Sequence, residues 1–204
     1  MPLVKAPAPQ TPAAPAFPDR ASVLAAIESL DPSERRAAAW ASRAYADGID
    51  IIAHRLAVES DAAVVEAMIL NLVAIGSPKA AAVLAPLLRS GSAARRFAAA
   101  EALRDLGPDA LPMFDALIRD EDPQVRIMAA EVARGQLGGA AAQTLERLLP
   151  DEDHVNTACA FIDVLAEIGS AGTAPVLRHF ADRHAGNAYV RFAVDTALAR
   201  LPAA

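Results

Sequence analysis

The chain has 204 residues, of which 54% are hydrophobic and only 4% aromatic. Alanine-rich apolar runs of this composition favour close-packed helices, and no strand-like alternation interrupts them. Acidic residues number 25 against 19 lysines and arginines, for a formal net charge of −6. This balance argues against nucleic acid as the main partner, because phosphate binding needs clustered basic side chains.

We expect no membrane partner, because no run approaches about 18 uninterrupted apolar residues. The single cysteine, Cys159, cannot form an intrachain disulfide. No apolar segment near Met1 has the length of a secretory signal. A reducing compartment follows from this cysteine usage, so we predict a cytoplasmic protein.

Residues 1–19 are predicted to be a disordered arm rich in proline and alanine, ahead of a repeat domain that covers residues 20–204. Prolines stand at every third position, Pro9, Pro12, Pro15 and Pro18. This spacing matches the three-residue turn of polyproline II. Such an arm is either a ligand for an aromatic groove or a spacer, and we favour the spacer.

Capping residues mark the first helices. Asp19-Arg20 opens a helix that runs to about Leu30, Asp31-Pro32-Ser33 opens the next, Ile49 to Ser60 forms a third, and Asp61 caps Ala62 to Ile75. Trp40, the only tryptophan, could mark a binding patch. We favour core filling in an end unit.

The central helix signature is the stretch from Asp122 to Gly138, in which an acidic residue precedes Pro123 and a glycine closes an apolar stripe. The same ending recurs at a strict interval of 31 residues, as Ile75-Gly76, Leu106-Gly107, Leu137-Gly138 and Ile168-Gly169. A period of this size indicates stacked supersecondary units.

Two more columns keep this period. Nine and four residues before each glycine stand Ala67, Ala98, Ala129 and Ala160, and Leu72, Leu103, Arg134 and Leu165. The same offsets reach Ala193 and Leu198 after a two-residue insertion. A shorter apolar segment follows each glycine, as Ala80 to Leu88, Ala110 to Ile118, Ala140 to Leu149 and Thr173 to Phe180, so each unit is predicted to be a helical hairpin.

In these residues the chain resembles the HEAT repeat family, specifically the short HEAT-like repeats of phycobilin lyases, with the consensus Asp-Pro-x-Val-Arg-x-x-Ala-Ala-x-Ala-Leu-x-x-Leu-Gly. Asp122 to Ala130 matches the first half and Ala99 to Gly107 the second. The resemblance implies an all-α, right-handed α-solenoid of about six antiparallel hairpins. It says little about function, because the family includes scaffolds, adaptors and a few enzymes.

The acidic turns Asp120-Glu121-Asp122 and Asp151-Glu152-Asp153 lack the ligand spacing of a calcium loop, so we predict helix capping and no metal. Arginines follow these turns, at Arg95, Arg96, Arg126 and Arg191. They could bind a ligand anion. The resemblance implies instead a structural ladder between neighbouring units, formed by Arg95 and Arg126 with Asp122 and Asp153.

We predict that the protein is not an enzyme and needs no cofactor. The four histidines form no His-Glu pair, so the ligands of the HEAT-repeat enzyme deoxyhypusine hydroxylase are missing. Cys159 is interpreted as an inert packed thiol. No phosphate loop or Ser-His-Asp signature is present.

Function is therefore assigned to the surface of the repeats. In HEAT solenoids the second helix of each hairpin lines the concave side, and its outward positions lie ten, six and two residues before the glycine. The predicted partner-binding residues are Glu66, Leu70, Phe97, Glu101, Asp105, Met128, Val132, Gln136, Asp163 and Glu167, with Ala74 and Cys159 in the same columns. If this facing is wrong by a turn, several of them are buried between helices instead.

The leading hypothesis is an adaptor or scaffold that binds another protein through this face, since apolar residues between carboxylates suit a segment with apolar anchors and basic flanks. A bilin lyase or chaperone-like enzyme is the second hypothesis, suggested by the phycobilin-lyase repeats. A HEAT-like DNA glycosylase ranks last, because its groove should be basic and aromatic.

Overall fold

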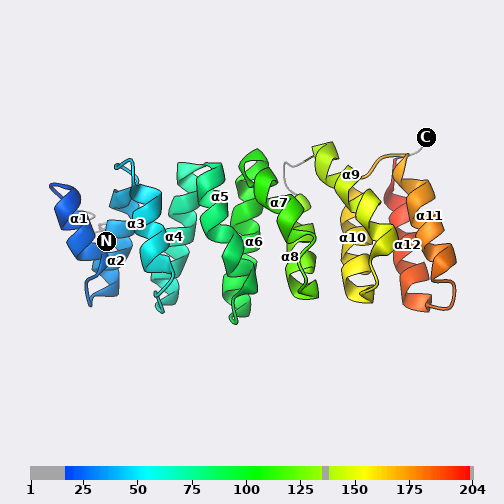
Figure 1. The fold of residues 1–204 in the computed structure, drawn as a ribbon, viewed down its shortest axis with the longest axis horizontal. Coiled ribbons are helices and arrows are strands. Elements are labelled where there is room, and N and C mark those ends of the chain that lie inside the picture. The colour runs from blue at the N-terminus through cyan, green and yellow to red at the C-terminus, as the bar shows by residue number, and fades with distance from the viewer. Residues whose placement is uncertain (1–16, 135–137, 203–204) are drawn as a thin grey trace, which may run out of the picture. The chain divides into compact units, whose positions relative to one another are not determined.

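The structure, a computed structural model, describes residues 17–134 and 138–202. Most of the predicted arm lies outside these residues. The described parts contain no strand and twelve α-helices, which pair into six hairpins (Figure 1). The first six helices are α1 Arg20–Ile27, α2 Pro32–Ser42, α3 Gly48–Leu56, α4 Ala62–Ile75, α5 Pro78–Leu84 and α6 Ala93–Asp105. The others are α7 Leu111–Leu117, α8 Pro123–Ala133, α9 Gly138–Leu148, α10 Val155–Ile168, α11 Thr173–Arg183 and α12 Ala188–Arg200.

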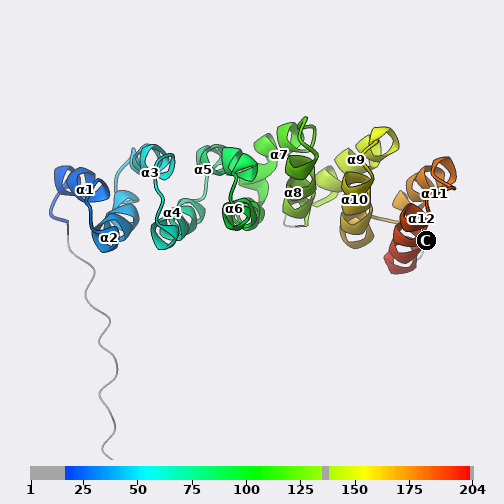
Figure 2. The ribbon, with the colours of Figure 1, turned by 90° about the horizontal axis from the view of Figure 1, so that it is seen from below.

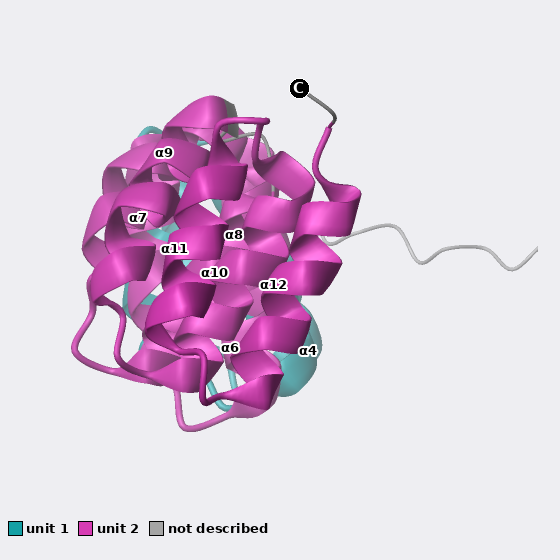
Figure 3. Ribbon diagram, turned by 90° about the vertical axis from the view of Figure 1, so that its right-hand side faces the viewer, with its two compact units in different colours: residues 1–68 teal, residues 69–204 magenta. Residues whose placement is uncertain are grey.

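Three short 3₁₀ segments extend or precede the first helices of hairpins: η1 Ala85–Arg89, η2 Gly107–Ala110 and η3 Leu149–Asp151. The chain forms two compact units, residues 1–68 and 69–204 (Figure 3). Within the second unit, α6, α8, α10 and α12 pack one beside the next. The first helices of these hairpins, α5, α7, α9 and α11, form a second layer against one side of the layer of second helices (Figures 2 and 3). The predicted all-α solenoid of helical hairpins is confirmed.

The leucine column forms the seam between helices. Leu72, Leu103 and Leu165 are fully buried, and so are the first-helix residues Phe114 and Leu145. Burying each of these side chains contributes roughly 2 kcal/mol. The repeated apolar positions therefore supply the continuous core that a stack of hairpins needs.

Capping residues start most helices, as predicted. Asp19, Asp31 and Asp122 each accept a hydrogen bond from a backbone N–H of the first turn, at 2.8 Å in all three cases. Asp61 caps α4 through the N–H groups of Ala63 and Val64. Two predicted glycine ends also hold, because Gly76 and Gly107 have φ of 62° and 54°, a conformation that favours glycine.

Three predicted helix ends are wrong. Helix α1 ends at Ile27, and Leu30 is almost wholly exposed. Helix α3 ends at Leu56 rather than at Ser60. Helix α8 ends at Ala133 with Arg134 as its C-cap, and Gly138 begins α9 rather than closing α8. The glycine column therefore marks the turn between helices, but the turn itself differs from one repeat to the next.

The prediction that Trp40 fills the core is also wrong. Its side chain is 37% exposed, and the Arg43 guanidinium carbon lies 5.5 Å from the ring centre. A cation at this distance is attracted to the negative face of the ring. Small residues fill this part of the core instead, since Ala38 and Ala39 are fully buried.

A recurring arginine contact stabilises the turn within a hairpin, between its first and second helix. The arginine four residues after the N-cap donates to the carbonyl oxygen two residues before that cap. The distances are 2.9 Å for Arg35 to Ser29, 2.8 Å for Arg96 to Ser90, 2.8 Å for Arg126 to Asp120 and 3.5 Å for Arg191 to Ala185. Each guanidinium thus satisfies a carbonyl that the turn leaves without a helical partner.

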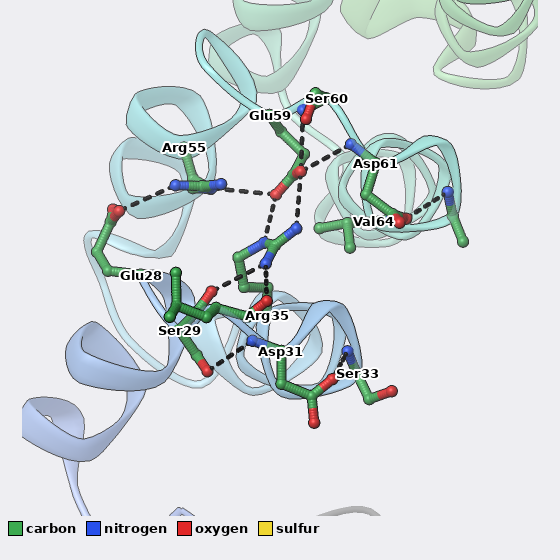
Figure 4. A network of polar contacts seen from close by, with 12 residues as sticks. Glu28, Ser29, Asp31, Ser33, Arg35, Arg55, Glu59, Ser60, Asp61 and Val64 are labelled. Carbon is green, nitrogen blue, oxygen red and sulfur yellow. Dashed lines mark hydrogen bonds and ion pairs between the residues drawn. The ribbon is translucent and has the colours of Figure 1, made fainter.

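Two of these arginines also bind a carboxylate of the next hairpin. Arg35 donates two hydrogen bonds to Glu59, at 2.7 and 3.0 Å, and Arg126 donates two to Glu152, both at 2.8 Å. Glu59 accepts in turn from the Asp61 N–H at 2.8 Å (Figure 4). One carboxylate therefore connects the arginine of one hairpin to the start of a helix in the next.

The predicted ladder has the right kind of contact but several wrong residues. Arg126 does join two hairpins, but its partner is Glu152, whereas Asp153 is exposed and Asp122 caps its own helix. The carboxylate that binds the preceding hairpin stands two residues before the N-cap, as Glu59 and Glu152 do. The N-cap side chain accepts a hydrogen bond from the backbone of its own helix instead, as Asp122 does. Arg96, not Arg95, occupies the repeated position.

The Arg35–Glu59 pair predicts an acid-sensitive first unit. Burial opposes ionisation of Glu59, but the hydrogen bonds from Arg35 and the Asp61 N–H outweigh it and lower the pKa of Glu59 from 4.5 to about 2. The contribution to stability is thus present above about pH 4.5 and is lost as the pH falls toward 2. We expect Glu59→Gln to destabilise the unit by about 3 kcal/mol at neutral pH and to remove this pH dependence.

Urea denaturation followed by the fluorescence of Trp40 measures both effects, at about pH 7 and about pH 3. Glu34→Gln, on an exposed position of α2, is the matched control and should change neither. If the free energy of unfolding depends on pH equally in wild type and in Glu59→Gln, then Glu59 is not the source of the acid sensitivity.

Candidate functional site

One row of apolar side chains crosses the layer of second helices in the second unit. Phe97 on α6, Met128 on α8, Cys159 on α10 and Phe192 on α12 follow one another at intervals of 31, 31 and 33 residues. They occupy the same turn of successive helices, because the last interval contains the two-residue insertion. Phe97 is 59% and Phe192 69% exposed, while Met128 and Cys159 are half-buried. We call these four residues the apolar row.

Two hollows open along the apolar row. One, of about 360 Å³, lies between α6 and α8 and is lined by Phe97, Ala100, Glu101, Arg104, Met128 and Glu131. The other, of about 450 Å³, lies between α10 and α12 and also reaches Ile127 of α8. Its walls include Cys159, Tyr189 and Phe192, with Asp163 and Arg200 at one side. Each hollow therefore joins members of the row from neighbouring helices.

Cys159 contributes an apolar wall to the larger hollow. Burial raises the pKa of its thiol, so the group stays protonated at neutral pH and lacks the electropositive setting of a reactive cysteine. It acts here as a small hydrophobic side chain.

Charged side chains flank the row toward the C-terminal ends of the helices. Arg134 stands at the centre of one cluster: it binds Glu131 at 2.8 Å and also pairs with Asp163 and Glu167 of α10. Arg200 of α12 pairs with the same two carboxylates, at 3.3 and 3.1 Å. Burial opposes the charge of Arg134, but its three carboxylate partners raise its pKa. The cluster thus links α8, α10 and α12.

A one-residue shift in α8 accounts for the exception in the leucine column. Leu103 and Leu165 lie eleven residues after the N-caps of their helices, and the residue at that place in α8 is Ala133, which is fully buried. Arg134 follows it as the C-cap, with only 16% of its side chain exposed. Its aliphatic stem can cover apolar surface at the end of the helix, while the guanidinium reaches the carboxylates at the surface.

The predicted partner-binding residues divide into four groups. Glu66, Leu70, Phe97, Glu101 and Asp105 are exposed and Met128 is half-exposed. Asp163 and Glu167 are exposed but already ion-paired. Gln136 lies outside the described residues. Glu66 belongs to the first unit and the others to the second.

Val132 is buried, with 1% exposure, so its assignment to the outward ridge is wrong. The reason is helical periodicity: Val125, Ala129 and Val132 follow at intervals of four and three and share the buried face of α8. The sequence prediction missed Phe192 and Tyr189. The signal for Phe192 was present, since it follows Cys159 by the same 33 residues that separate Ala160 from Ala193.

Two of the four histidines, His154 and His184, have structural contacts. His154 caps α10, with Nδ1 accepting from the Thr157 N–H at 3.3 Å, and the His184 ring stacks on Phe180 at 4.2 Å. Residues 17–134 and 138–202 hold no group of three or more histidine, cysteine or acidic side chains placed to bind a metal. Over the same residues, every helix is too short or too polar to cross a membrane.

The chain is similar to a curated protein and to several solved structures. No protein family profile matches the chain. It is 26% identical over 152 residues to an uncharacterized phycocyanin operon protein Z of Pseudanabaena tenuis (strain PCC 7409), covering 70% of this chain and 75% of that protein.

Among solved structures, the chain is similar to an archaeal HEAT-like repeats protein from Thermococcus onnurineus NA1, with 15% identity, a TM-score of 0.49, and coverage of 88% of this chain and 85% of the other. An engineered protein aligns with 18% identity and a TM-score of 0.42 over 87% and 94% of the two chains.

The Arg134 cluster makes a prediction about stability. Arg134→Ala leaves two carboxylates of α10 with only Arg200 and removes a packed stem, so we expect a loss of about 2 kcal/mol. Urea denaturation followed by helical circular dichroism measures the loss. Arg119→Ala removes an arginine that pairs with Asp115 at 3.4 Å and is 42% exposed, so it should change stability by less than about 0.5 kcal/mol. If both variants lose the same amount, the cluster is not a structural link.

Proposed function

We propose that this chain of HEAT-like repeats is a non-catalytic interaction module that binds a partner protein across the second-helix layer of its second unit. One observation carries the proposal: an apolar row, with a phenylalanine at each end, crosses four packed helices and stays open to solvent. Isolated exposed apolar residues are common on protein surfaces, but a contiguous set within a polar rim is typical of interaction sites.

The exposed aromatic residues support binding to a protein. Only 4% of the chain is aromatic, yet Phe97, Tyr189 and Phe192 are each more than half exposed. Aromatic side chains fill pockets in partners and dominate interface energetics. They contribute little to folding at this exposure, so binding is the role that their position favours.

The charges around the row support an adaptor over a nucleic-acid enzyme. Glu101, Asp105, Glu131, Asp163 and Glu167 lie beside the row, against Arg104, Arg134 and Arg200. Five carboxylates against three guanidinium groups give this surface an acidic balance, whereas a glycosylase groove has to attract phosphates. A cytoplasmic location fits this proposal and is part of it.

A role in bilin attachment or in the handling of a phycobiliprotein is a second candidate. Its support is the similarity to a phycocyanin operon protein, over 70% of this chain. This candidate differs from the first in requiring a pigment or a phycobiliprotein as the partner.

Site-specific photo-crosslinking tests the leading proposal. We replace Phe97 with the photoreactive benzoylphenylalanine in the full chain, irradiate it in the lysate of its native organism, and identify the adducts by mass spectrometry. We expect a specific protein adduct at position 97. The matched control is the same replacement at Leu111, which is 40% exposed on α7 in the other layer of the same unit; it should give no such adduct.

Equal adducts at both positions, or none at position 97, would overturn binding through the apolar row. An adduct that carries visible bilin absorbance, or that is a phycobiliprotein subunit, would favour the second candidate.

A further inference from the structure

The apolar row crosses the second helices rather than following one of them. This course limits which kind of peptide segment can bind along it. On two of the four helices the row residue has a charged neighbour one turn on, since Glu101 follows Phe97 and Asp163 follows Cys159 by four residues. Across the helices, by contrast, Phe97 is followed by Met128, Cys159 and Phe192. A ligand that crosses the helices therefore meets a longer series of apolar side chains than one that follows α6 or α10.

The distance between packed helices sets the period of such a ligand. Packed helix axes lie about 8–10 Å apart, so row residues on neighbouring helices repeat at about this distance. A polyproline II segment rises about 3.1 Å per residue and completes a turn in three residues, or about 9.3 Å. Side chains at every third residue of such a segment would thus match successive members of the row.

The carboxylates beside the apolar row indicate which side chains the bound segment should carry on the edge that faces them. Glu101 and Asp163 lie four residues beyond the row, about 6 Å along the helix axes. Glu101 has a long contact with Arg104, at 3.6 Å, and 72% of its side chain is exposed. Asp163 remains 58% exposed despite its arginine partners. Basic side chains on the edge of the segment that faces these carboxylates would complement them.

We infer that the apolar row binds an extended, basic segment of a partner protein that crosses α6, α8, α10 and α12, with an apolar side chain at every third residue and lysine or arginine between them. This inference rests on the proposed function and specifies its partner. Aromatic grooves that bind extended proline-containing segments gain affinity because the segment is already ordered and loses little conformational entropy on binding. A segment of this kind would have the same advantage on the apolar row.

A designed peptide tests the inference. The probe is a fluorescent peptide with four Leu-Pro-Lys repeats, titrated into the full chain and followed by fluorescence anisotropy. One control peptide has the same composition with its four leucines adjacent, which removes the three-residue period. A second has glutamate in place of lysine. We expect the probe to bind at least about tenfold more tightly than either control.

Variants of the protein locate the binding. Phe97→Ala combined with Phe192→Ala should weaken the probe by about tenfold or more, whereas Leu111→Ala should leave it unchanged. Glu101→Lys should weaken the lysine probe and strengthen the glutamate one. Circular dichroism of each variant confirms that the fold is kept.

Equal binding of the periodic and non-periodic peptides would overturn the inference, as would an unchanged affinity in the double phenylalanine variant. Absence of binding up to about 1 mM, or preference for a helical peptide with leucine at every seventh residue, would also overturn it. A specific photo-adduct at position 97 would in those cases leave the proposed function standing.

Discussion

The contact between an arginine near the start of one second helix and a carboxylate of the next hairpin is the constraint on which the repeat stack depends. Arg35 and Arg126 each satisfy carbonyl oxygens of their own turn and form two hydrogen bonds to a glutamate in the following hairpin. Glu59 then accepts from the N–H at the start of a helix. Because turn backbone has no helical partners, these bonds fix the turn and the spacing of the hairpins together.

These arginine–glutamate contacts lie at the turns, and the bulk that fills the stack comes from buried residues such as Leu103 and Leu165. The outer face of the second helices carries structural contacts only toward their C-terminal ends, where Arg134 and Arg200 bind the carboxylates of α10. The positions of Phe97 and Phe192 take part in none of these. They are therefore available for binding, and this separation of structural and exposed positions is what makes helical repeats suitable as binding surfaces.

The sequence predicted the hairpins well because period and caps are local signals. Asp19, Asp61 and Asp122 were recognisable as helix starts from the chain alone, and the glycine interval gave the repeat. The carboxylate partner of Arg126 was not predictable, since Asp151, Glu152 and Asp153 are adjacent and only the backbone of the turn decides which one faces the preceding hairpin.

Rotation of a helix about its axis was equally hard to predict. Val132 and Met128 lie four residues apart, yet one is buried and the other half-exposed, because the apolar stripe of α8 is broad. Trp40 shows the same difficulty. Its size indicated the core, but alanines filled that space, and the ring lies at the surface beside Arg43.

The arginine at position 134 bears on how such a protein can change by duplication. Arg134, the C-cap of α8, binds carboxylates on two helices. The repeat with Arg134 is hard to copy alone, because two of the three carboxylates that the guanidinium binds, Asp163 and Glu167, belong to the repeat that follows. A copy placed elsewhere would keep only Glu131 beside this largely buried cation. These two repeats are therefore expected to be inherited, and recombined in engineered arrays, as a pair.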